Sequence, residues 1–96
     1  MYTTIRRYDG FDPTTVEGII QRVESGFLPI VSAVEGFISF RYIDAGGGVI
    51  ATISTFETQA AAEQSNKAAE GWVKENLSEF NPTLPQITAG EVRIDK

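Results

Sequence analysis

The sequence predicts a small α+β fold whose elements follow one another as strand, helix, strand, strand, helix and strand. Three observations lead to this prediction. Four short runs are rich in β-branched and aromatic residues, two segments carry apolar residues at helical spacing, and turn-forming residues separate them. The chain has 96 residues, so we expect residues 1–96 to form a single domain.

The first strand and the first helix are predicted in the N-terminal third of the chain. Residues 2–8 form a strand-like run that ends at an Asp-Gly turn signal. Asp12 is placed to cap a helix, and Pro13 suits the first helical turn. Gly26 and Pro29 should loosen this helix near its end. Its apolar stripe consists of Val16, Ile19, Ile20, Val23 and Phe27.

The next two strands are predicted over residues 37–44 and 49–56. Between them, residues 45–48 contain three glycines, a composition typical of a hairpin turn because glycine accepts positive φ. A strand rather than a helix follows these glycines, so they do not indicate a phosphate-binding loop.

The second helix is predicted over residues 58–80, a segment dense in alanine, with Thr58 as its N-terminal cap. Asn81 and Pro82 should end this helix, because proline cannot continue it. Residues 87–94 then form the last predicted strand.

This order of elements is that of the ferredoxin-like βαββαβ fold, a four-stranded antiparallel sheet with both helices on one face. Neither alternate set of side chains on the middle strands is charged enough for a face that lies in water. We therefore expect a second copy to cover the open face in a homodimer. On residues 37–43 the two sets are Ile38, Phe40 and Tyr42, and Phe37, Ser39, Arg41 and Ile43.

Composition excludes several classes of function. The net charge is −5 and the densest basic pair is Arg6 and Arg7, so neither nucleic acid nor an anionic membrane is an expected partner. The chain has no histidine and no cysteine, which removes the usual imidazole base, the commonest metal ligands and the thiol nucleophile. We expect no metal or other cofactor. We also expect a cytoplasmic location, since the N-terminus lacks the apolar core of a signal peptide.

A resemblance to a known family is carried by the segments MYTTIRRYDG, VEGFISFRYIDAGGG, TISTFET and NKAAEGWVKENL. They resemble the antibiotic-biosynthesis monooxygenase (ABM) domain family of the dimeric α/β-barrel superfamily. The resemblance implies two subunits packed sheet to sheet, with a pocket between the sheet and the helices of each. It implies a cofactor-independent monooxygenase that acts on a small aromatic or polyketide-like substrate. The alternative is a non-catalytic small-ligand-binding or accessory protein of the same fold.

The chain departs from two branches of that family. Haem-degrading members are similar in carrying a tryptophan on the second helix, matched here by Trp72, but they also need a histidine and a first-strand asparagine. This chain has no histidine, and its first strand carries Arg6 and Arg7 instead, so we reject a haem function. The polyketide oxygenases place an asparagine four residues before the tryptophan, where this chain has Ala68; the nearest candidates for that asparagine are Asn66 and Asn76.

Trp72 and Asn76 are the candidate pocket residues on the second helix. The indole of Trp72 could form the wall of an aromatic-binding pocket, or it could simply pack between helix and sheet. Asn76 follows one turn later and is either a pocket residue or an exposed one. A continuous cavity of a few hundred Å³, roughly, that contains Trp72 and an ionisable donor would favour an enzyme.

The candidate pocket residues on the strands are Arg6, Arg41, Tyr8 and Tyr42. An arginine could stabilise the oxyanion of an enolate or phenolate, and a tyrosine could donate a hydrogen bond. The alternatives are half-buried packing for the tyrosines and ion pairs for the arginines. Those ion pairs would involve Glu35, Asp44 or Glu91.

Overall fold

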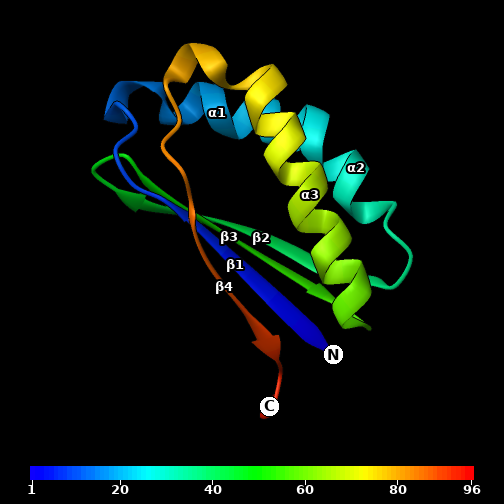
Figure 1. The fold of residues 1–96 in the computed structure, drawn as a ribbon. Helices are drawn as coiled ribbons and strands as arrows, with labels where there is room; N and C mark the ends of the chain where they lie inside the picture. The colour runs from blue at the N-terminus through cyan, green and yellow to red at the C-terminus, as the bar shows by residue number, and fades with distance from the viewer.

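In a computed structural model that describes residues 1–96, four strands form one antiparallel sheet in the order β2-β3-β1-β4. All helices lie on one face of that sheet (Figure 1). The predicted ferredoxin-like βαββαβ fold is therefore confirmed. The strands are β1 (Tyr2–Tyr8), β2 (Phe37–Gly46), β3 (Val49–Phe56) and β4 (Gln86–Glu91), and the α-helices are α1 (Val16–Arg22), α2 (Leu28–Ser32) and α3 (Gln59–Asn76).

The first helical region begins at a cap and is interrupted by a wider turn. The Asp12 carboxylate accepts hydrogen bonds from the Thr14 amide at 2.9 Å and the Thr14 hydroxyl at 2.8 Å, and these bonds lower its pKa. A 3-10 turn, η1 (Pro13–Thr15), leads into α1. A π-helical turn, η2 (Val23–Phe27), then separates α1 from α2. The interruption falls where Gly26 and Pro29 are expected to loosen the helix.

The second helix is shorter than predicted. The Thr58 hydroxyl accepts a hydrogen bond from the Ala61 amide at 3.2 Å, which caps α3 as expected. The helix ends at Asn76 instead of Phe80, and the chain continues as a 3-10 turn, η3 (Ser78–Phe80). At the C-terminus, β4 ends at Glu91, three residues before the predicted end of that strand.

The strand register decides which side chains face the helices. Arg6 on β1 lies opposite Thr52 on β3, and Thr52 lies opposite Tyr42 on β2, so the three side chains form one row across the sheet. On β2 an irregularity falls between Phe37 and Ser39. It breaks the alternation predicted for Ile38, Phe40 and Tyr42, and Ile38 is 45% exposed.

The hydrophobic core fills the layer between the sheet and the helices. It includes Phe56, Ile19 and Ala62, which are almost completely buried. The opposite face of the sheet has no helix over it (Figure 1). None of the helices is both long and apolar enough to cross a lipid bilayer.

The hairpin turn supports the start of the first helical region. The Phe11 amide donates a hydrogen bond to the Gly48 carbonyl at 3.2 Å, and Gly48 has a positive φ of 82°. A side chain at Gly48 would collide with the Phe11 carbonyl, whereas a side chain at Gly47 would meet nothing within 4 Å.

We therefore predict that Gly48→Ala destabilises the protein by about 3 kcal/mol or more, since it adds a collision to an unfavourable backbone conformation. Gly47→Ala is the control, because Gly47 also has a positive φ, of 63°, but lies in open space. It should cost about 1–2 kcal/mol. Urea unfolding measures both values, and equal losses would show that the contact between the turn and Phe11 is unimportant.

Candidate functional site

A narrow cavity lies between the sheet and the helices and encloses about 40 Å³. This space holds a few water-sized groups and is too small for an aromatic ring. The lining is almost entirely apolar, with the polar groups of Arg6, Tyr8, Tyr42 and Thr52 contributed by the sheet. The other lining residues are Phe11, Ile19, Val23, Phe27, Ile50, Ala69, Trp72, Val73 and Leu77.

Two grooves adjoin this inner cavity. The outer groove, of about 230 Å³, shares Arg6, Tyr8 and Val73 with the cavity. A second groove, of about 280 Å³ between the first helical region and β2, shares Val23 and Tyr42 with it. The inner cavity alone is smaller than expected for an enzyme site, whereas each of the two grooves beside it has about that size.

Arg6 is a buried cation whose partners are all neutral. It is only 6% exposed. Its Nε and Nη2 atoms donate to the Tyr8 hydroxyl at 3.3 and 3.0 Å. Its Nη1 donates to the side-chain and backbone oxygens of Asn66 at 3.3 and 3.5 Å. Arg6 forms no ion pair with an acidic residue. The salt bridges of the protein are Arg7–Asp9 and Arg22–Glu79.

Asn66 is held in place by a second residue of β1. Its amide nitrogen donates to the Thr4 hydroxyl at 3.0 Å, and Thr4 is almost completely buried. Asn66 lies on the face of α3 that also carries Ala62, Ala69 and Val73, which packs against the sheet. The guanidinium of Arg6 is therefore fixed from both the strand and the helix.

The Tyr42 hydroxyl is buried and has no hydrogen-bond partner. Burial, reinforced by the nearby charges of Asp44 and Glu17, raises the pKa of this phenol well above its ordinary value. The group is therefore protonated at neutral pH and can donate a hydrogen bond to an oxygen atom placed beside it. It cannot serve as a base under the same conditions.

Trp72 forms one wall of the cavity and fits against the π-helical turn. Its ring lies 5.6 Å from the ring of Phe27, centroid to centroid. A Cβ atom at Gly26 would lie 2.9 Å from Cζ2 and 3.2 Å from Nε1 of Trp72, so only glycine leaves room for the indole. π-Helical turns that interrupt an α-helix often occur at functional sites, because they change which side chains face inward.

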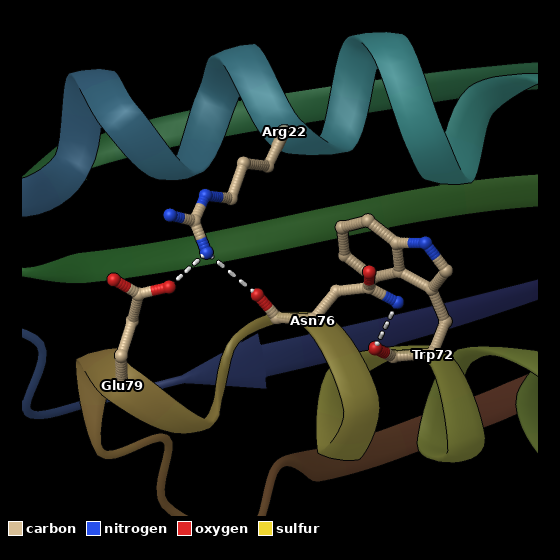
Figure 2. A network of polar contacts seen from close by, with 4 residues as sticks. All are labelled: Arg22, Trp72, Asn76 and Glu79. Atoms are coloured by element: carbon tan, nitrogen blue, oxygen red, sulfur yellow. Dashed lines mark hydrogen bonds and ion pairs between the residues drawn. The ribbon is translucent and has the colours of Figure 1, made fainter.

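A clamp between α1 and the C-terminal end of α3 lies beside Trp72 (Figure 2). Arg22 donates to the Asn76 carbonyl at 2.9 Å and to the Glu79 carboxylate. Its guanidinium also lies 4.7 Å from the ring centroid of Phe80. These contacts satisfy a free carbonyl at the helix end and hold α1 and α3 together next to the cavity.

Two of the candidate residues lie away from this cavity. Arg41 is exposed on the open face of the sheet, because it lies opposite Ile53 and not in the row that contains Arg6. Asn76 is exposed, and its amide donates to the Trp72 carbonyl at 3.0 Å (Figure 2). The structure thus brings together Arg6, Tyr8, Tyr42 and Trp72.

No group of three His, Cys, Asp or Glu side chains could hold a metal ion.

Comparison with solved structures identifies the fold. A monooxygenase from the gene ActVA-Orf6 of Streptomyces coelicolor, solved with the ligand nanaomycin D, superposes with a TM-score of 0.77 at 17% identity, over 99% of this chain and 89% of that one. A dimeric ferredoxin-like protein from an uncultured marine organism superposes with a TM-score of 0.78 at 12% identity, over 99% and 96%. This chain has their fold. The expected resemblance is confirmed at that level.

A third similar structure holds a ligand of a different kind. A mutant of MhuD, solved with two manganese protoporphyrin IX molecules bound per active site, superposes with a TM-score of 0.75 at 14% identity, over 100% of this chain and 98% of that one. No family model matches the sequence. No curated protein matches it either. At these identities the similarity establishes the fold and leaves the chemistry to the residues of the site.

Sequence reasoning misses how Gly26 and Arg22 shape the site, and it offers Asn66 only as one of two candidates, with Asn76, for the asparagine of the polyketide oxygenases. The sequence indicates Gly26 only as a point of weakness in a helix, although this glycine leaves the space that Trp72 occupies. Asn66 shares a helix face with Ala62 and Ala69, so its helical spacing is a usable signal. Arg22 gives no signal, because the sequence does not show that α1 passes the end of α3.

We predict that Gly26→Ala displaces the indole of Trp72 and destabilises the protein by about 1–3 kcal/mol, as expected for an overpacked contact. Trp72 is the only tryptophan, so its fluorescence reports the displacement directly. Gly71→Ala is the matched control, since Gly71 lies in α3 with nothing within 4 Å. It should stabilise the helix by about 0.5–1 kcal/mol. Unchanged fluorescence in Gly26→Ala would contradict the proposed fit.

Proposed function

We propose that this protein is a cofactor-independent monooxygenase that acts on a small aromatic or polyketide-like substrate. The observation that carries the proposal is the row of buried polar groups, Arg6 and Tyr42, beneath the aromatic wall of Trp72. The Tyr42 hydroxyl supports it most directly, because a buried donor without a partner costs stability and gains a role when a ligand accepts its hydrogen bond.

The proposed chemistry uses the acidity of the substrate itself. An anthrone or a similar compound loses a proton from carbon to give an enolate, whose oxygen accepts the hydrogen bond of Tyr42. The enolate carbon then forms a bond with O₂, and one proton completes a hydroperoxide. Loss of water from the hydroperoxide breaks the O–O bond and leaves a carbonyl. The balance is one CH₂ group and one O₂ consumed, and one C=O group and one water formed.

The chain's own residues favour these reaction steps by stabilising negative charge and excluding water. The substrate is more acidic when the negative oxygen of its enolate accepts a hydrogen bond in a site of low polarity. Trp72 and Phe27 offer aromatic surfaces that orient a flat ring beside that donor. No histidine is present to take the proton, so the substrate must ionise readily by itself.

We further propose that the working form is a homodimer in which two sheets pack face to face. The open sheet face carries Ile5, Ile43, Ala51 and Ile53, and Ile43 is 42% exposed in one chain. Apolar side chains gathered on one exposed face often mark an interface, although Arg7 and Arg41 lie on the same face. The similar structure that is described as dimeric supports the same arrangement. A second copy supplies the cover that this chain lacks.

The alternative is a non-catalytic protein that binds a small ligand. The size of the inner cavity favours it, since about 40 Å³ accommodates part of a ligand only. The absence of an evident base in the cavity agrees with it as well. Under this alternative, ligands bind beside Trp72 without any consumption of oxygen.

The test is oxygen consumption with a panel of anthrones and hydroquinones. We expect turnover by the natural protein, a loss of about tenfold or more in Tyr42→Phe, and a similar loss in Trp72→Phe. Tyr2→Phe is the matched control, because it removes a phenol from the helix-facing side of β1 outside the cavity lining. Equal rates in all four proteins would remove both residues from the mechanism. Binding without oxygen consumption would favour the alternative.

A further inference from the structure

The charge of Arg6 has no counterpart within the chain. A guanidinium keeps its positive charge in proteins, and burial of a charge is unfavourable unless an opposite charge or a full set of hydrogen bonds compensates it. Arg6 is 6% exposed, and its hydrogen bonds reach only neutral oxygens, on Tyr8 and Asn66. Its guanidinium carbon lies 5.8 Å from the centroid of the Tyr8 ring, another neutral partner.

Arg6 also retains hydrogen-bonding capacity. A guanidinium offers five N–H donors. Nη2 carries two of them, and its acceptor, the Tyr8 hydroxyl at 3.0 Å, is shared with Nε. One hydrogen of Nη2 therefore has no acceptor. The Tyr8 hydroxyl accepts these bonds and keeps its own hydrogen available for donation.

The outer groove gives access to this pair of residues. It is lined by Arg6 and Tyr8 at its inner end and by Val73 and the segment of residues 82–85 along its sides. Its remaining lining residues, Glu70 and Lys74, carry opposite charges and offset each other. Arg6 therefore gives the groove an excess of positive charge at its inner end. The prolines and Leu84 of the segment provide an apolar wall.

We infer that Arg6, together with the hydroxyl of Tyr8, binds the carboxylate of a small aromatic acid that enters through the outer groove. A planar carboxylate accepts the N–H of Nη2 and the O–H of Tyr8 through its two oxygens. The ring of the ligand then contacts Val73 and extends toward the inner cavity. The inference rests on the proposed function for the aromatic nature of the ligand, and it adds that the ligand is an anion before any reaction.

The register of the sheet sets the distance between the two polar ends of the site. Arg6 and Tyr42 are separated by β3, so their Cα atoms lie about 10 Å apart, which is two interstrand spacings. In this binding mode the carboxylate lies at the Arg6 end of the site and the reacting oxygen at the Tyr42 end, as two different groups of the ligand.

The experiment is an NMR titration of the ¹⁵N-labelled protein with benzoate and, separately, with benzamide, which has the same ring and no charge. The indole N–H of Trp72 and the Nε–H of Arg6 report binding. We expect benzoate to bind about tenfold or more tightly than benzamide, as loss of a charge-assisted contact predicts. Arg6→Gln should bring benzoate to the affinity of benzamide. Equal affinity of the natural protein for the two compounds would overturn the inference.

Arg7→Gln is the matched control, because Arg7 is the next residue, is exposed and pairs with Asp9 at 3.4 Å. It should leave both affinities unchanged, and an equal effect of the two substitutions would reveal general charge attraction instead of a site. If Arg6→Gln fails to fold, the comparison of benzoate with benzamide in the natural protein and in Arg6→Lys decides the question. A preference for benzoate without oxygen consumption would refute the oxygenase proposal alone.

Discussion

The helices of this chain cover one face of a four-stranded sheet and leave the other face without cover, and the rest of the structure depends on that constraint. The sheet holds Arg6, Thr52 and Tyr42 in one row under the helices. An antiparallel sheet can leave one face in water, but the exposed isoleucines of this open face favour its burial. The helices shield one face, and we propose that a second copy covers the isoleucines and threonines of the other.

The packing of the helices leaves a space over the row formed by Arg6, Thr52 and Tyr42. Small residues such as Ala62 and Ala69 let α3 pack closely on the sheet, whereas Trp72 lies further along the helix and rests against Gly26. The clamp made by Arg22 then fixes the end of α3 (Figure 2). A narrow, apolar cavity results, with a fixed cation at one end and a protonated hydroxyl at the other. Chemistry on a ligand held there is governed by these two groups.

The fold could be predicted from the sequence, while the site could be predicted only in part. Strands β1 and β3 match their predicted bounds, because a turn signal marks one end of each run: Asp9 and Gly10 follow β1, and the glycines of residues 46–48 precede β3. Trp72, Arg6, Tyr8 and Tyr42 also stand out as candidates in the sequence. The row that Arg6 and Tyr42 share with Thr52 depends on register, which no local pattern specifies once an irregularity interrupts β2. Register also places Arg41 opposite Ile53 and Ile5, on the face of the sheet that does not carry Arg6.

Sedimentation velocity at micromolar protein concentration tests most directly whether a second copy covers the open face of the sheet. The account predicts a species of about twice the 10.5 kDa chain mass. Ile43→Lys, on the open face, should convert this species to monomer, whereas Ile30→Lys should leave it intact, because Ile30 is an equally accessible isoleucine on α2. A natural protein that sediments as a compact monomer at every concentration would contradict the account.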